Sequence, residues 1–207
     1  MRQLKKYFIV TALIALPSLF VHAQHVSGGF KGGLTMSNLY IDKNEVDDEN
    51  ARFGFHAGLF SQIMLSEHFG IQPEILFTTK GTEATYDGLI NQTVDFRMNY
   101  LDLPVMAVVR PIELLEIYAG PYVGLLINTN VKYSGTFEGE ETLDRDNFNT
   151  LDYGFTGGMA LNFGSVTTGI RYSLGLQKLA NSNRSEILLG DSKNAYGQLY
   201  IAFRLSE

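Results

Sequence analysis

The sequence contains no cysteine and no tryptophan among its 207 residues. Without cysteine there is no disulfide framework, no thiolate nucleophile and no metal site with cysteine ligands. Charged residues make up only 18% of the chain, whereas soluble domains usually have about 25%. The 16 basic and 22 acidic residues give a formal charge of −6, which argues against a nucleic-acid partner.

The chain does contain 45% hydrophobic and 12% aromatic residues, together with 21 glycines. This content is too high for intrinsic disorder. The length suits a single domain, since β-barrels of this size are common.

The first 23 residues are typical of a secretory signal peptide. Arg2, Lys5 and Lys6 precede an apolar run over residues 7–21, and small residues stand at positions 21 and 23. The alternative is a transmembrane anchor, but the run is shorter than the roughly 20 residues that a spanning helix needs. We therefore predict cleavage after Ala23, with residues 24–207 forming the mature domain. Loss of three cations would leave 13 basic against 22 acidic residues, a formal charge of −9.

Beyond residue 24 the hydrophobic pattern has a period of two, which is typical of β-strands. The pattern predicts eight strands, each near the about 9–11 residues that a tilted strand needs to cross a bilayer. Their ranges are Val26–Met36, Arg52–Met64, Phe69–Lys80, Tyr100–Arg110, Leu115–Asn128, Leu151–Phe163, Val166–Leu176 and Ala195–Leu205.

The predicted connections alternate between long and short. Long segments join the strands at residues 37–51, 81–99, 129–150 and 177–194, and short ones at residues 65–68, 111–114 and 164–165. Outer-membrane barrels have this pattern, with short periplasmic turns and long external loops. The fold class predicted is therefore all-β, an eight-stranded antiparallel up-and-down transmembrane β-barrel.

The charged residues of the strands all take the parity opposite to the apolar side chains, a bias that chance would rarely produce. We expect them to form a structural charge network inside the barrel. Its members are Lys31, Arg52, Glu74, Lys80, Asp102, Arg110, Glu116, Asp152, Arg171 and Arg204.

A soluble lipocalin-like barrel would also alternate, with its apolar face turned inward. The polar face here carries many glycines, such as Gly58, Gly120 and Gly158, instead of a solvated coat of Lys and Glu. Small residues with a few charges suit a narrow eight-stranded interior. Aromatic residues on the apolar face gather near both strand ends, as the girdles of membrane barrels do. They are Phe69, Phe163 and Phe203 at the short-turn end and Phe53, Phe77, Tyr153 and Tyr172 at the other.

Several stretches, in this order and spacing, resemble the PorT-like family of outer-membrane barrels, which is related in architecture to the OmpX and OmpA type. The stretches are GFKGGLTMSNL (29–39), FGIQPEILFTTKG (69–81), NYLDLPVMAVVRP (99–111), IYAGPYVGLLIN (117–128), DYGFTGGMALNFG (152–164) and TTGIRYSLGL (167–176).

The resemblance implies an integral protein of a Gram-negative outer membrane. Its partners would be outer-membrane lipids, lipopolysaccharide and, during insertion, the barrel assembly machinery. The family's namesake is tied to protein secretion, but a shared barrel does not establish a shared role. Such barrels usually end on an aromatic residue, whereas this chain continues for four residues after Phe203.

The interior charges allow two interpretations, a structural plug and a path for protons or ions. Buried charges need partners, so we expect Glu74 and Asp102 to pair with Arg171 or Lys31. An eight-stranded interior is normally filled by side chains, which favours the plug.

The long loops carry the acidic excess. The candidate acidic surface consists of Asp47, Asp48, Glu49, Glu140, Glu141, Asp144 and Asp146. The segment from Asp144 begins like a calcium loop, but Phe148 stands at a ligand position and Asn149 replaces the required glycine. A solvated loop is favoured over loose divalent bridging to lipopolysaccharide, and we predict no metal site and no cofactor.

No catalytic residue is predicted. Outer-membrane enzymes need a His or carboxylate cluster at the outer rim, and only His56 of the four histidines lies within a predicted strand. A hydrogen-bonded interior position is expected for it. The sequence thus predicts a non-enzymatic, plugged barrel with a structural role or a loop-mediated role in binding an extracellular protein. The alternatives are an accessory of a secretion system and a soluble ligand-binding barrel.

Overall fold

The computed structural model describes residues 25–40, 49–86, 92–135, 139–143, 149–178 and 193–206. These residues form nine β-strands. The strands are β1 (His25–Tyr40), β2 (Glu49–Met64), β3 (Phe69–Tyr86), β4 (Gln92–Ile112), β5 (Leu115–Gly135), β6 (Gly139–Leu143), β7 (Leu151–Phe163), β8 (Val166–Lys178) and β9 (Lys193–Ser206).

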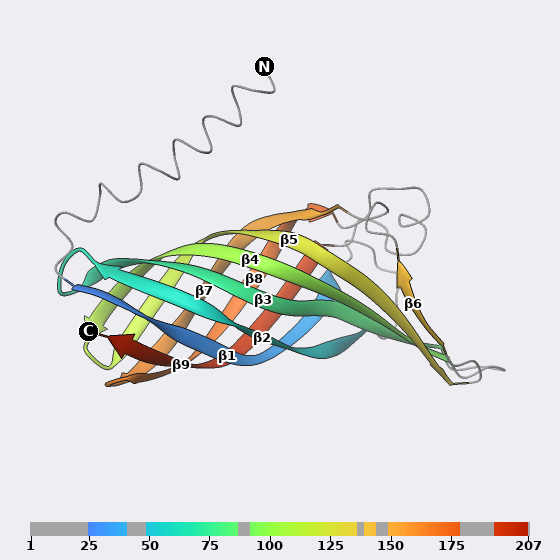
Figure 1. Ribbon diagram of the computed structural model, residues 1–207, viewed down its shortest axis with the longest axis horizontal. Coiled ribbons are helices and arrows are strands. Elements are labelled where there is room, and N and C mark those ends of the chain that lie inside the picture. The colour runs from blue at the N-terminus through green and yellow to red at the C-terminus, as the bar shows by residue number, and fades with distance from the viewer. Residues whose placement is uncertain are drawn as a thin grey trace, which may run out of the picture.

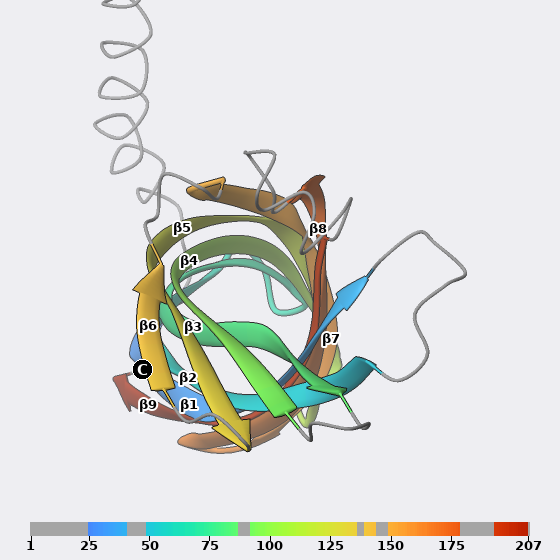
Figure 2. The same cartoon turned by 90° about the vertical axis from the view of Figure 1, so that its right-hand side faces the viewer.

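Eight of the strands close into an antiparallel barrel. The strands pair in the order β4-β3-β2-β1-β9-β8-β7-β5, and the additional β4–β5 pairing closes the cycle. The first and last strands meet in the register Phe30↔Phe203, where the two rings stack with centroids 5.2 Å apart. Figure 2 shows the closed wall seen from one end. The predicted fold class is confirmed.

The strands run longer at the long-loop end than the sequence pattern predicts. The predicted loop at residues 81–99 is largely strand, because β3 continues to Tyr86 and β4 begins at Gln92. The predicted loop at 129–150 contains the end of β5 and all of β6, which pairs only with β5 at residues 129–133. These strands project beyond β7, whose pairing with β5 ends at Leu125↔Leu151. The projection lies on the right in Figure 1.

Alternate side chains face the lumen and the outside, as the period of two requires. Strand β7 shows the alternation directly, since its residues 151–156 switch between exposed and buried at every position. The outer surface is apolar, with Phe53 71%, Phe155 61% and Leu199 55% exposed. The aromatic residues assigned to the two girdles lie on this surface, where Phe163 is 58% and Tyr172 55% exposed. Among the described residues no helix is long and apolar enough to cross a membrane.

One part of the interior is apolar. Phe60, Met106, Val108, Tyr118, Ala160, Tyr200 and Ala202 form a buried cluster. Many of the other inward positions carry buried polar and charged side chains, which supply the candidate site.

Candidate functional site

The central feature of the lumen is a triad of two cations and one carboxylate. Glu74 on β3 accepts hydrogen bonds from Arg171 on β8 at 2.8 and 2.9 Å, and from Lys31 Nζ on β1 at 2.9 Å. No side chain of the three is more than 2% exposed. Because β3 and β8 lie four strands apart in the cycle of eight, the Glu74–Arg171 pair spans the barrel from wall to wall.

Two tyrosines flank this triad. The Nζ of Lys31 lies 3.7 Å from the ring centroid of Tyr200, and Cζ of Arg171 lies 5.2 Å from that of Tyr118. Tyr118 also donates its hydroxyl to the carbonyl of Ile170 at 3.1 Å. Cation–π contacts of this kind partly offset the cost of burying an unequal number of positive and negative charges.

A second triad has the opposite composition, with one cation and two carboxylates. Lys80 Nζ lies 2.9 Å from Oδ1 of Asp102 on β4 and 3.2 Å from Oδ2 of Asp152 on β7. Hydroxyl and amide groups supply further donors to the carboxylates, from Tyr196 to Asp102 at 3.3 Å and from Asn194 to Asp152 at 2.9 Å. Three tyrosine rings also surround the ammonium group of Lys80, namely those of Tyr100, Tyr122 and Tyr196 with centroids at 4.4, 5.0 and 4.4 Å.

The other predicted interior charges lie at the two ends of the lumen. Arg110 and Glu116 pair at 2.7 Å at the short-turn end, where Arg204 donates to the carbonyl of Gly164 at 3.3 Å. Near the long-loop end Arg52 pairs with Asp95. The structure thus distributes the ten residues over four groups along the lumen.

One predicted pairing differs in the structure. Glu74 meets both Lys31 and Arg171, but Asp102 pairs with Lys80 and with neither of those two cations. The reason lies in height along the barrel axis, because Asp102 is opposite Leu76 and not opposite Glu74 in the β3–β4 register.

His56 is hydrogen-bonded inside the barrel, as predicted. Its Nδ1 lies 3.1 Å from Oγ1 of Thr35, and the residue is 1% exposed. It therefore lies away from the outer rim, where a catalytic histidine would be needed. Within the described ranges no group of three or more His, Asp or Glu residues could hold a metal ion.

Most of the predicted acidic surface lies outside the described residues, namely Asp47, Asp48, Asp144 and Asp146. The proposed signal peptide also lies outside them. Glu49 begins β2, and Glu140 and Glu141 lie in β6. In the β5–β6 register Glu140 stands opposite Lys132.

The predicted charge network leaves out the uncharged polar side chains of the interior. Five tyrosines and two glutamines surround the charges, namely Tyr100, Tyr118, Tyr122, Tyr196, Tyr200, Gln62 and Gln72, all 6% exposed or less. The alternation already held this signal, since Tyr118 and Tyr122 share the parity of Glu116.

Inward glycines make room for these larger groups. A Cβ atom at Gly124 would lie 2.5 Å from Oδ1 of Asp102, and one at Gly169 would lie 2.6 Å from the hydroxyl of Tyr200. Such distances are too short for a side chain, so the carboxylate and the ring occupy the space beside each glycine.

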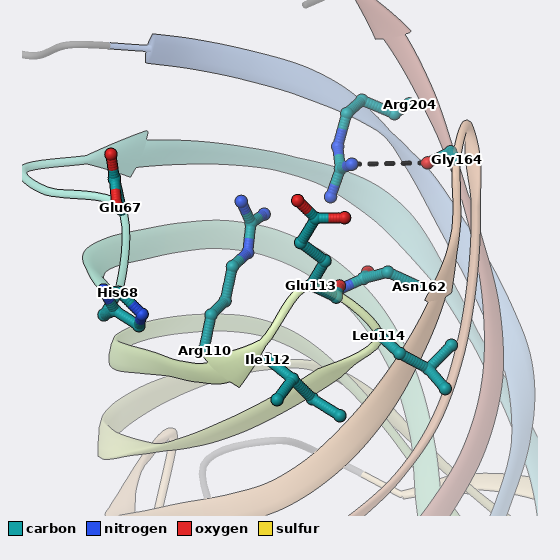
Figure 3. Close-up of a pocket in the computed structure, with 9 residues that line it drawn as sticks. All are labelled: Glu67, His68, Arg110, Ile112, Glu113, Leu114, Asn162, Gly164 and Arg204. Atoms are coloured by element: carbon teal, nitrogen blue, oxygen red, sulfur yellow. Dashed lines mark hydrogen bonds between the residues drawn. The ribbon is translucent and has the colours of Figure 1, made fainter.

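The short-turn end opens into a polar mouth of about 800 Å³ (Figure 3). Its lining residues are Glu67, His68, Arg110, Ile112, Glu113, Leu114, Asn162, Gly164 and Arg204. A separate and much smaller space of about 10 Å³ lies beside Lys31, Gln72 and Glu116.

Comparison with known proteins places this geometry in context. The family model described as outer membrane protein beta-barrel domain matches residues 22–181. No curated protein matches the chain. Among solved structures, Ail, the attachment invasion locus protein of Yersinia pestis, is 18% identical with a TM-score of 0.51, covering 88% of this chain and 100% of that chain. Neisserial surface protein A is 10% identical with a TM-score of 0.50, covering 86% of this chain and 96% of that chain. At these identities the likeness shows the fold alone.

Proposed function

Because the chain belongs to the outer membrane protein beta-barrel domain family, we propose that it is a non-enzymatic outer-membrane barrel whose lumen is plugged. The observation that carries this proposal is the wall-to-wall contact of Glu74 with Arg171, together with Lys31, at the centre of the lumen. An open aqueous pore would leave such groups hydrated, whereas these side chains are no more than 2% exposed. Eight-stranded barrels have interiors just wide enough for side chains to fill.

The proposed orientation places the short turns in the periplasm and the long-loop end outside the cell. Three short connections lie at one end, at residues 65–68, 113–114 and 164–165, and β1 begins and β9 ends there (Figure 1). Membrane barrels of this type have short periplasmic turns. The proposal includes removal of residues 1–23 on export, which N-terminal sequencing of the purified protein tests by finding Gln24 first.

The proposed role is the binding of an extracellular protein at the long-loop end. The projecting sheet supports it, because the β4–β5 pairing continues to Gln92↔Gly135, well past the last β5–β7 pair. Strand β6 pairs antiparallel with β5 there and adds a strand to the projecting sheet. The acidic residues at this end, including Glu49, Glu140 and Glu141, favour a basic partner surface through complementary charge. The Ail structure contains sucrose octasulfate, a heparin analogue, and a polyanion of that kind would be repelled by these acids.

The alternative proposal, a secretion accessory of the PorT-like type, rests on the sequence resemblance alone. It predicts that a secretion complex co-purifies with the protein from native membranes. Purification of the barrel without such a complex favours the binding role.

The third possibility, a soluble ligand-binding barrel, is opposed by the exposed apolar belt. Heat-modifiable migration on SDS gels tests the membrane barrel directly. We expect the detergent-extracted protein to migrate differently before and after boiling. Recovery of the mature protein from the periplasm without detergent would contradict the proposal.

A further inference from the structure

A small space inside the barrel is lined by members of two different charge groups. They are Lys31, which belongs to the triad of Glu74, and Glu116, which pairs with Arg110. The volume of this space, counted as the room open to the centre of a water molecule, is about 10 Å³. One buried water needs about 10–15 Å³ counted in the same way. The space therefore has the size of a site for a single water molecule.

Lys31 has a hydrogen-bond donor to spare beside this space. An ammonium group carries three N–H donors. In the described part of the chain Nζ donates to one acceptor, Oε1 of Glu74 at 2.9 Å, and it also makes the 3.7 Å cation–π contact with the ring of Tyr200. At least one N–H is thus left without an acceptor, although the side chain is only 1% exposed.

Glu116 has an acceptor to spare beside the same space. Its Oε1 accepts hydrogen bonds from Nε of Arg110 at 2.7 Å and from Nε2 of Gln62 at 3.2 Å. Within the described residues both bonds end on this one oxygen, so Oε2 accepts none. The side chain is 4% exposed, and a buried carboxylate oxygen without a donor is costly. A donor molecule in the space would remove that cost.

Thr167 supplies a further acceptor. Its hydroxyl donates to Oδ1 of Asn162 at 2.7 Å, which leaves the lone pairs of Oγ1 able to accept. Thr167 lines the space together with Lys31 and Glu116. One donor and two acceptors thus surround a space of one water, and buried waters typically make about three hydrogen bonds.

We propose that one ordered water molecule occupies this space and bridges Lys31 to Glu116. The water accepts a hydrogen bond from Nζ of Lys31 and donates its two hydrogens to Oε2 of Glu116 and Oγ1 of Thr167. Such a bridge is nearly as favourable in enthalpy as a direct hydrogen bond. It joins the Arg110–Glu116 pair on β4 and β5 to the triad on β1, β3 and β8. The site goes beyond the proposed function, because it depends neither on the orientation in the membrane nor on a loop partner.

A crystal structure of the native chain tests the site directly, at a resolution that shows other ordered waters inside the protein. We expect density for one water within about 3.2 Å of both Nζ of Lys31 and Oε2 of Glu116. Absence of density there, or density that contacts only one of the two atoms, would overturn the proposal. A direct contact between Lys31 and Glu116 would overturn it as well.

Magnetisation transfer from water to alanine methyl groups tests the same site in solution, with the intact barrel in detergent micelles. Ala202 lines the space, whereas Ala160 is not among the described lining residues, and both belong to one buried apolar cluster. We expect the Ala202 methyl group to show a cross-peak with water of the sign that marks a long-lived bound molecule. We expect none at Ala160. No cross-peak at Ala202, or equal cross-peaks at both, would count against the water.

Two variants test the role of Glu116. Glu116→Leu removes the acceptor and is expected to abolish the Ala202 cross-peak. The matched control is Glu113→Leu, which removes a carboxylate that lines the mouth and not this space, and it should keep the cross-peak. A cross-peak that persists in Glu116→Leu would overturn the bridge, because the water would then be held without Glu116. If Glu116→Leu does not fold, the comparison of Ala202 with Ala160 in the native chain decides.

Discussion

Glu74 on β3 accepts hydrogen bonds from two nitrogens of the Arg171 guanidinium on β8, at 2.8 and 2.9 Å. The two strands face one another across the barrel, so this bidentate pair joins opposite walls. Lys31 adds a second cation to the same carboxylate at 2.9 Å. In the proposed account this arrangement plugs the lumen, and it makes the folded barrel depend on one acidic side chain.

Glu74→Gln should destabilise the barrel strongly. The substitution leaves Lys31 and Arg171 buried without their counter-charge, and removal of one partner from a buried ion pair typically costs about 3–5 kcal/mol. Unfolding by urea in lipid vesicles measures the free energy of unfolding. Arg97→Gln, which removes a half-exposed partner of Asp95, is the control and should cost about 1 kcal/mol or less. Equal effects of the two variants would contradict the central role of Glu74.

The second triad predicts which of two substitutions lowers the free energy of unfolding more. Lys80→Met leaves Asp102 and Asp152 facing one another without a cation, whereas Asp102→Asn leaves Lys80 paired with Asp152. We therefore expect Lys80→Met to lower the free energy of unfolding more than Asp102→Asn does. The opposite order, measured in the same vesicles, would show that the carboxylates do not depend on Lys80.

The close approach at Gly124 gives a prediction about packing. A methyl group there would meet Oδ1 of Asp102 at 2.5 Å, and overpacking of a filled interior typically costs about 1–3 kcal/mol. Gly124→Ala should be destabilising by that amount in thermal or urea unfolding. Gly139→Ala on β6 is the matched control, since a Cβ atom there meets nothing within 4 Å, and it should have little effect.

Leu199→Arg distinguishes a lipid-facing surface from a water-facing one. Leu199 is 55% exposed on the outer face of β9. A charge at mid-bilayer on a barrel costs about 2–4 kcal/mol, so folding into vesicles should be weakened by an amount in that range. In a soluble barrel the same substitution would be nearly neutral, and a neutral result in vesicles would therefore argue against the membrane-facing assignment.

The alternation of side chains explains why so much of the barrel could be predicted. The side chain of a strand residue points to one of only two faces of the sheet. The inward direction of Lys31, Glu74 and Arg171 therefore follows from the outward direction of their apolar neighbours. The pairings β2–β3, β4–β5 and β7–β8 follow in turn from the short turns that join these strands. These are local properties, which the sequence carries at each position.

Two features could not be predicted because they depend on relations between distant strands. The partner of Asp102 is fixed by the height at which the inward side chains of β3, β4 and β7 meet, and period two does not encode that height. The extension of β3 to Tyr86 carries no regular apolar alternation, and the extension of β4 back to Gln92 alternates at Val94, Phe96 and Met98 with the parity opposite to that of the apolar residues that begin at Leu101. Their pairing is visible only in the structure.

Single-channel conductance of the purified protein in planar bilayers tests the plugged lumen most directly. The native barrel should show no steady large conductance, because Glu74, Lys31 and Arg171 fill the centre of the lumen. The matched variant Glu74→Gln should show more frequent openings than the native protein, provided that it inserts. A steady large conductance of the native barrel would contradict the account.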